Sequence, residues 1–286
     1  GTRLDSEDPA SVAAFQISHA GLLDELARLG RETRANTALA DRIRHKYRLK
    51  NTTGLSLNAL VDYDQPLDIL QHLLVGSEGT LGFISAVTYD TVVDHPHKAS
   101  ALIVFPTVES CCKAVTVLKQ QPVSAVELLD RRSLRSVQNK PGMPEWVKGL
   151  SDSACALLIE SRAASQSLLH EQLDLIMASI ADFPLEQKVD FSEDPAVYNL
   201  LWKIRKDTFP AVGAVRQTGT TVIIEDVTFP VEQLAEGVNR LIQLFDKHRY
   251  DEAIIFGHAL EGNLHFVFTQ GFNSAEEVAR YQAFMD

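Results

Sequence analysis

The sequence has little cysteine, an excess of acidic over basic residues, and no long apolar run. The cysteines, Cys111, Cys112 and Cys155, have the spacing of neither a disulfide framework nor a Cys-x-x-Cys metal site. Lysine and arginine number 27 against 38 acidic residues, and the net charge of −11 argues against a nucleic-acid partner. No apolar stretch approaches the roughly 18 residues of a membrane span, and no signal-peptide pattern is present. We therefore expect a protein of a reducing compartment, the cytoplasm, without a transmembrane segment.

The 286 residues suffice for a sizeable core, and a hydrophobic content of 45% is ordinary for a globular protein. The chain begins at Gly1 rather than at a methionine. Its last residues, 274–286, have the pattern of an amphipathic helix that is cut short. These features indicate a piece of a longer protein.

Two histidines flank a probable turn in residues 256–266, Phe-Gly-His-Ala-Leu-Glu-Gly-Asn-Leu-His-Phe. β-forming residues precede and follow this stretch, and Glu261-Gly262 predicts the centre of a two-residue hairpin turn. In that register His258 stands directly opposite His265, with Cβ atoms roughly 4.5–5.5 Å apart. Two imidazoles so placed can share a metal ion or hold a substrate oxygen. The alternative is a pair of polar side chains on the solvent face.

A glycine-rich segment, residues 76–84, reads Gly-Ser-Glu-Gly-Thr-Leu-Gly-Phe-Ile. Glycine at every third position permits positive φ and close approach of a ligand to the backbone. The segment is neither a P-loop nor a dinucleotide fingerprint, because it lacks Gly-Lys-Ser/Thr and has a different glycine spacing. By itself it predicts a ligand-binding loop or a plain turn equally well.

After a predicted strand at residues 83–93, the sequence predicts two strand–helix–strand units. Repeated units of this length are typical of an α+β, ferredoxin-like antiparallel sheet with helices on one face. The insert between the two units, residues 131–153, contains Pro-Gly-Met-Pro and is expected to be a surface excursion. The expected elements are strands 101–105, 123–128, 154–160 and 188–191 and helices 108–118 and 165–180.

A further helix is predicted to begin at Asp194-Pro195 and to carry Trp202 and Arg205 near one face. A guanidinium suits a substrate carboxylate because its planar fork donates two parallel hydrogen bonds. The alternative is an ordinary solvated arginine.

Three of these motifs resemble motifs of FAD-linked 2-hydroxyacid dehydrogenases, and they follow one another along the chain in the same order as in that family. These flavoproteins of the vanillyl-alcohol-oxidase type include D-lactate and D-2-hydroxyglutarate dehydrogenases. Residues 76–82 are nearly identical to the family's Gly-Ser-Glu-Gly-Thr-Leu-Gly, and residues 201–205 resemble its Leu-Trp-x-x-Arg. Residues 257–265 are similar to Gly-His-x-x-Asp-Gly-Asn-Leu-His, although Leu260 and Glu261 stand where the family usually has Gly and Asp.

The resemblance implies that residues 1–93 end a FAD-binding domain. Residues 94–286 would then be the FAD-linked oxidase C-terminal domain, truncated at its end. FAD would be held by the whole protein and not by this piece, because the family's earlier pyrophosphate-binding half has no counterpart ahead of Gly76. The resemblance is closest to large members with iron–sulfur domains, so any iron–sulfur cluster would lie outside this chain. The implied partners are the missing parts of the polypeptide, a small 2-hydroxyacid and an electron acceptor, through which the protein could be peripheral to a membrane.

In the implied site, Arg205 would clamp the substrate carboxylate and Asn263 would also contact the substrate. His258 and His265, with or without a divalent metal such as Zn²⁺, would polarise the hydroxyl while a base takes its proton. The residues implied to bind FAD are Gly76, Ser77, Glu78, Gly79, Thr80, Gly82 and Ile84.

Two other functions fit the same sequence. One is a non-catalytic ferredoxin-like interaction module, and the other is a flavin oxidase of a phenolic or sugar alcohol. Some relatives carry a substrate-binding lysine where this chain has Ile223 and Ile224, which leaves the choice of hydroxyacid open. We expect the isolated chain to be inactive.

Overall fold

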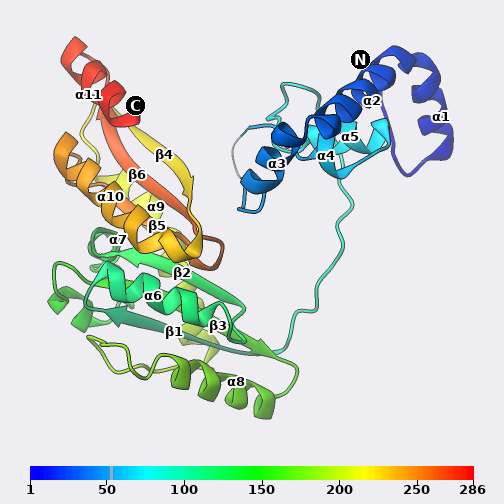
Figure 1. Cartoon of the computed structure of the whole chain (residues 1–286). Coiled ribbons are helices and arrows are strands. Elements are labelled where there is room, and N and C mark those ends of the chain that lie inside the picture. The colour runs from blue at the N-terminus through cyan, green and yellow to red at the C-terminus, as the bar shows by residue number, and fades with distance from the viewer. Residues whose placement is uncertain (52–53) are drawn as a thin grey trace. The chain divides into compact units, whose positions relative to one another are not determined.

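The computed structural model describes residues 1–51 and 54–286, and it divides the chain into two compact units, Gly1–Thr91 and Val92–Asp286 (Figure 1). The boundary expected from the sequence, after residue 93, lies close to this division. Within the described residues, no helix is long and apolar enough to cross a membrane.

The first unit is a small helical cluster. Asp8 and Asn36 cap two of its helices with side-chain oxygens. The core is formed by apolar residues that include Phe15 and Ile69. A Cβ on Gly30 would lie 3.0 Å from Cδ1 of Ile69, so two helices approach closely here. The helices are α1 (Pro9–Ser18), α2 (Ala20–Ala35), α3 (Thr37–Lys46), α4 (Ala59–Asp62) and α5 (Pro66–Leu74).

Residues 83–93 do not form the strand predicted for them. They are extended, without a strand partner among the described residues, and their apolar side chains lie in solvent: Phe83 is 90% exposed and Val92 is 92% exposed. A strand is defined by hydrogen bonds to a neighbouring strand, and here nothing in the described chain supplies one. Residues 83–93 thus have the residue pattern of a strand but no neighbouring strand, within the described chain, to form hydrogen bonds with.

The second unit is built on a six-stranded sheet in the order β1-β3-β2-β5-β6-β4. All neighbouring strands are antiparallel. The chain runs from β1 through α6 to β2, and β3 then inserts between these two strands, which is the split β-α-β arrangement of ferredoxin-like folds. The strands are β1 (His97–Phe105), β2 (Ala125–Asp130), β3 (Cys155–Ala163), β4 (Thr220–Thr228), β5 (Ile254–His258) and β6 (Asn263–Gly271).

The strand predicted at residues 188–191 is reduced to a single bridge, Ser192 to Ser100, on the free edge of β1. This is the place that a fourth ferredoxin-like strand would take. The sheet instead grows at its other edge, where β5, β6 and β4 extend it beyond β2. The α+β prediction is confirmed, with a larger sheet than expected.

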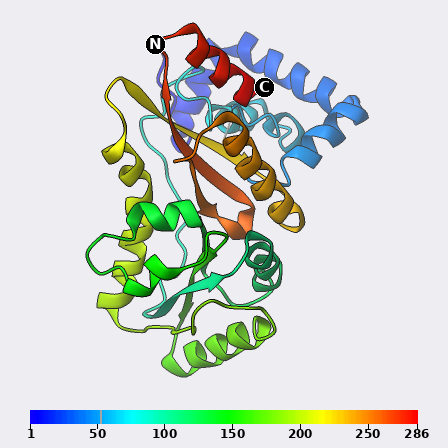
Figure 2. The ribbon, with the colours of Figure 1, turned by 90° about the vertical axis from the view of Figure 1, so that its left-hand side faces the viewer.

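Helices cover both faces of this sheet (Figures 1 and 2), so the prediction that helices lie on one face is wrong. The main core lies between one face and α6 (Val108–Leu118), α8 (Gln166–Ser179) and α10 (Leu234–His248). A second core lies between the opposite face and α7 (Arg131–Val137) and α9 (Pro195–Val215). The terminal α11 (Ala275–Met285) adds Phe284 to the main core.

The insert at residues 131–153 is not a surface excursion. It forms α7 and a 3-10 turn (Glu145–Gly149), and Leu134, Val137 and Val147 are completely buried in the second core. Leu134 and Val137 are three residues apart, so both project from one side of α7 into the second core. The Pro-Gly-Met-Pro segment, residues 141–144, lies in the connection between α7 and the 3-10 turn.

The histidine hairpin has a different register from the one predicted. Phe256 lies opposite His265, and His258 lies opposite Asn263, so the loop has four residues rather than two. Residues Ala259–Glu261 form a 3-10 turn that ends at Gly262 with φ +64°. The register differs by two residues, and an even shift leaves every side chain on its original face. His258 and His265 therefore remain on the same face.

Gly262→Ala is expected to lower the free energy of unfolding by about 2–4 kcal/mol, because positive φ strains alanine and its Cβ would overlap the carbonyl oxygen of Phe229. Denaturant unfolding followed by fluorescence of Trp146 and Trp202, both in the second unit, measures this change. Gly149→Ala is the control, since no atom lies within 4 Å of its Cβ position. Equal stabilities of the two variants would contradict the expectation.

Candidate functional site

Four strands place ionisable side chains side by side on the sheet face that α9 covers. Glu127 of β2 lies opposite His258 of β5, and Asp226 of β4 lies opposite His265 of β6. Arg205 reaches the same face from α9 and contacts Glu127. We call these five residues the polar row. The structure thus brings together three residues predicted as site residues, Arg205, His258 and His265.

Glu127 is buried at the centre of this row. Its Oε1 accepts a hydrogen bond of 2.6 Å from Nδ1 of His258. Its Oε2 accepts from Nε and Nη2 of Arg205, at 2.9 and 2.6 Å. A carboxylate can only accept, so Nδ1 of His258 carries the proton and Nε2 of the neutral ring keeps a lone pair.

The charge state of Glu127 follows from these contacts. Burial acts to raise its pKa, but the hydrogen bond from His258 and the positive charge of Arg205 outweigh burial and hold the pKa below its ordinary value. The side chain is therefore an anion at neutral pH, and its charge is balanced by the guanidinium.

His265 repeats this arrangement on the neighbouring strand pair, because its Nδ1 donates to Oδ1 of Asp226. The two imidazole centroids are 5.5 Å apart, with the rings nearly perpendicular. The His258 side chain is 41% exposed and the His265 side chain 22% exposed. Each ring is thus oriented by a carboxylate at Nδ1, which leaves Nε2 to accept a proton or to bind a metal.

Arg205 is held on two sides. Its guanidinium carbon lies 4.5 Å above the centre of the Phe256 ring, a cation–π contact, and the side chain is only 12% exposed. One turn earlier on α9, Nε1 of Trp202 donates to Oγ of Ser100 at 3.2 Å. Nε and Nη2 of Arg205 bind Glu127, and Nη1 is the guanidinium nitrogen that does not take part in this contact.

Asn263, predicted to contact substrate, lies opposite His258 but is completely buried. Its Nδ2 donates to Oγ1 of Thr228 at 3.2 Å. Its Oδ1 has no hydrogen-bond partner within the described part of the chain.

The predicted FAD-lining segment lies in the first unit, apart from the polar row in the chain. Gly76 and Gly79 have φ of +80° and +79°, and Glu78 also has positive φ. No atom lies within 4 Å of a Cβ built on Gly79, so the backbone there is open to a ligand. Ser77 is buried and accepts a hydrogen bond from the Thr80 amide, whereas Gly76, Glu78, Gly79, Thr80 and Ile84 are exposed and Gly82 is half-buried. This geometry fits a segment over which a cofactor lies.

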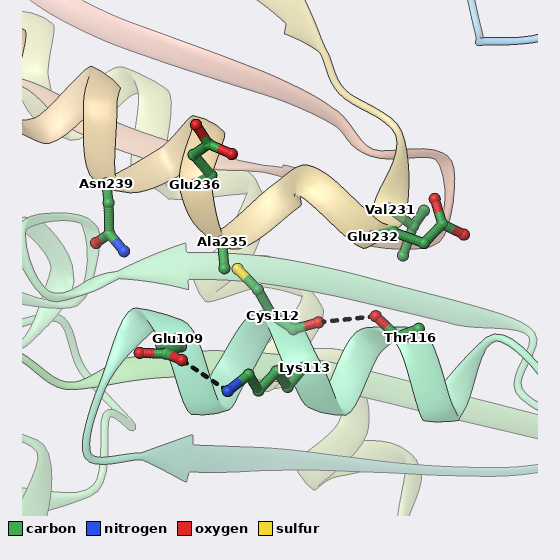
Figure 3. Close-up of a pocket in the computed structure, with 9 residues that line it drawn as sticks. All are labelled: Glu109, Cys112, Lys113, Thr116, Val231, Glu232, Ala235, Glu236 and Asn239. Carbon is green, nitrogen blue, oxygen red and sulfur yellow. Dashed lines mark hydrogen bonds and ion pairs between the residues drawn. The ribbon is translucent and has the colours of Figure 1, made fainter.

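A hollow of about 320 Å³ on the opposite face of the sheet contains no residue of the polar row (Figure 3). It lies between α6 and α10 and is lined mainly by solvated side chains, with Glu109 paired to Lys113. Cys112 is among the lining residues but is itself buried, and burial raises the pKa of this thiol, which stays protonated and unreactive. The polar row, not this hollow, is the candidate site.

A tight metal site is not complete in these residues. Across residues 1–51 and 54–286, no group of three histidine, cysteine or acidic side chains is arranged to hold a metal ion. His258 and His265 offer two ligands, whereas zinc sites take three or four from protein.

The sequence reasoning missed Glu127 as a member of the site. Its signal was an acidic residue inside an otherwise apolar predicted strand, Val-Glu-Leu-Leu. A charge at such a position must find a partner when the strand is buried. The partners lie 78 and 131 residues away in the chain, so the sequence alone did not reveal them.

Residues 94–286 match the family described as FAD linked oxidases, C-terminal domain. The mitochondrial D-lactate dehydrogenase (cytochrome) of Arabidopsis thaliana is 32% identical over 198 residues, which cover 68% of this chain and 33% of that protein. The mitochondrial D-2-hydroxyglutarate dehydrogenase of the same plant is 28% identical over 204 residues, covering 68% and 34%. Glycolate oxidase subunit GlcD of Bacillus subtilis is 27% identical over 225 residues, covering 76% and 45%.

The chain thus spans between a third and a half of the length of these relatives. Among solved structures, alkyldihydroxyacetonephosphate synthase superposes with a TM-score of 0.53 at 14% identity, over 76% of this chain and 43% of that one. At this identity the likeness shows a shared fold.

Glu127→Gln should change how stability depends on pH. A carboxylate whose pKa in the fold lies below its ordinary 4.5 stabilises the fold above that value, and loses this contribution as pH falls through the folded pKa. We expect the difference in unfolding free energy between wild type and Glu127→Gln to be larger near pH 5 than near pH 3. Asp130, whose pKa burial raises, acts with the opposite sign but is common to both proteins and cancels. A difference that grows on acidification would contradict this expectation.

Proposed function

The chain belongs to the FAD linked oxidases, and from that premise we propose that the whole protein is an FAD-dependent oxidoreductase of a D-2-hydroxyacid. The substrate class is that of D-lactate or D-2-hydroxyglutarate, which relatives of this chain are named for. The observation that carries the proposal is the polar row. It combines two carboxylate-oriented histidines with an arginine on one sheet face, which suits a hydroxyl and a carboxylate on adjacent carbons.

Oxidation of the hydroxyacid requires a base for the hydroxyl proton and an acceptor for the hydride. FAD, when bound, supplies the hydride acceptor. His258 or His265 accepts the hydroxyl proton at Nε2, and the carboxylate at Nδ1 stabilises the imidazolium that results. In its doubly protonated form, the second imidazole carries a hydrogen on Nε2 and polarises the same oxygen by donating to it. The two ring centroids lie 5.5 Å apart.

Arg205 binds the substrate carboxylate through Nη1, with its guanidinium held in place by Phe256 and Glu127. Asn263 stands beside the substrate as well: it lies opposite His258, and its Oδ1 has no partner in the described residues. Substrate is thereby oriented with its hydroxyl toward the histidines.

Residues 1–93 are the end of the FAD-binding domain in this proposal, and the open backbone around Gly79 supports that role. The cofactor would lie along Gly76, Ser77, Glu78, Gly79, Thr80, Gly82 and Ile84. Further parts of the polypeptide enclose the rest of the cofactor, cover exposed apolar residues such as Phe83 and Val92, and carry any iron–sulfur cluster. Alone, this chain would not retain FAD.

The remaining partners follow from the chemistry. Electrons pass from the flavin to an electron acceptor. If this acceptor lies in a membrane, the protein associates with the membrane surface by binding it. We place the enzyme in the cytoplasm, in keeping with three buried cysteines that are not in disulfides.

The activity is tested on the full-length, FAD-loaded protein by anaerobic reduction of its flavin with D- and L-2-hydroxyacids. We expect D-lactate or D-2-hydroxyglutarate to bleach the flavin and the L-isomers not to. His265→Asn should lower the rate of flavin reduction by about 10²–10⁴-fold, because the base or its partner is lost. Arg205→Lys should mainly raise KM, because lysine cannot reproduce the guanidinium geometry.

The matched control for this experiment is His170→Asn. His170 also pairs with a carboxylate, Glu193, but on the surface of α8 and outside the polar row. Its substitution should leave the rate unchanged. No flavin reduction by any 2-hydroxyacid would refute the proposed function.

A divalent metal such as Zn²⁺ would be held by His258 and His265. Two imidazoles complete only half of a tetrahedral shell, so Zn²⁺ should bind this chain weakly and the full-length protein much more tightly. Affinity should fall on acidification, because an imidazole must be neutral to bind a metal ion. Calorimetry on the chain and on His265→Ala tests the site, with His170→Ala as control. Tight binding that survives His265→Ala would contradict the assignment.

A further inference from the structure

Glu127 contacts two members of the polar row at once, one with each carboxylate oxygen. We propose that Glu127 is a positioning residue for the oxidation, because it fixes both the rotation of the Arg205 guanidinium and the tautomer of His258. The inference rests on the proposed function, since it assigns Arg205 to the substrate carboxylate and His258 to the hydroxyl.

The effect on Arg205 follows from the hydrogen bonds. Both donors on one edge of the guanidinium, Nε and Nη2, converge on Oε2 of Glu127, while the ring of Phe256 lies beneath the guanidinium plane. An edge contact and a face contact together define the orientation of a planar group. The direction in which Nη1 points is therefore fixed before substrate binds. Binding then does not include the entropy cost of ordering a mobile arginine side chain.

The effect on His258 comes from the other oxygen. A neutral imidazole can carry its proton on either nitrogen, and only the form with a free Nε2 can accept the hydroxyl proton there. Glu127 Oε1, 2.6 Å from Nδ1, selects that form.

A purely structural ion pair on the same sheet face provides the comparison. Glu160 of β3 is as buried as Glu127, binds Nε of Arg162 at 2.5 Å, and accepts from Oγ of Ser100 at 3.2 Å. It makes no hydrogen bond to any member of the polar row within the described residues. A glutamine at this position can still accept from Oγ of Ser100, so Glu160→Gln removes a buried carboxylate that makes no direct contact with the polar row.

The experiment compares Glu127→Gln and Glu160→Gln in the full-length enzyme loaded with FAD, with D-lactate and D-2-hydroxyglutarate as substrates. A glutamine has one accepting and one donating end, so it cannot accept from both His258 and Arg205. We expect Glu127→Gln to lower kcat/KM by about 10–100-fold, through a higher KM and a lower kcat. Glu160→Gln should stay within about twofold of wild type, whatever its effect on melting temperature.

A double-mutant cycle measures whether the effect of Glu127→Gln on KM depends on Arg205, a dependence that a purely structural role of Glu127 does not predict. If Glu127 acts on the substrate carboxylate through Arg205, Glu127→Gln should raise KM much less in an Arg205→Lys background than in wild type. If Glu127→Gln loses its flavin, Glu127→Asp takes its place. Its charge is retained, but a carboxylate shorter by one methylene cannot reach both partners, so the same pattern is expected.

Two results would overturn the inference alone: kcat and KM of Glu127→Gln equal to those of Glu160→Gln, or additive effects of Glu127→Gln and Arg205→Lys on KM. A wild-type enzyme that oxidises no 2-hydroxyacid overturns the proposed function and this inference together. That failure is visible before any variant is compared.

Discussion

The site depends on the cost of burying a carboxylate between two strands. An isolated buried anion is destabilising by several kcal/mol or more, and donors must surround it for the fold to form. Glu127 meets this requirement with one donor from β5 and one residue from α9, segments 131 and 78 residues away in the chain. The hydrogen bonds that compensate the charge of Glu127 therefore connect β2 of the ferredoxin-like part to β5, the first strand of the added part of the sheet. They also connect both strands to α9, which lies over this strand pair.

Sequence reasoning located much of this arrangement but not its register. The turn predicted at Glu261-Gly262 placed His258 and His265 on one face, and they do share a face, because the error in register was an even number of residues. The size of the error has a physical origin: Glu261-Gly262 does not form the tight two-residue turn, and a 3-10 turn closes the loop at Gly262 instead. The nearness of Arg205 to His258 was expected from the resemblance and is present, through a carboxylate that was not foreseen.

Other features lay outside the reach of local patterns. Residues 131–153 are predicted to be a surface excursion because they contain Pro-Gly-Met-Pro, whereas the burial of α7 in this segment depends on α9, which comes much later in the chain. The pairing of β2 with β5 joins segments that no periodicity connects. Residues 83–93 show the reverse case, in which a correct strand pattern has no neighbouring strand among the described residues to complete it.

This unpaired segment also bears on how the chain behaves in water. Its backbone amides and carbonyls, together with apolar side chains such as Phe83 and Val92, present the surface that open sheet edges offer to other chains. Native proteins protect such edges with charges, prolines or a covering element, and here the first charge after Asp90 is Asp94. At high concentration the same residues would template contacts between copies of the chain, so its colloidal stability depends on covering a stretch of only about a dozen residues.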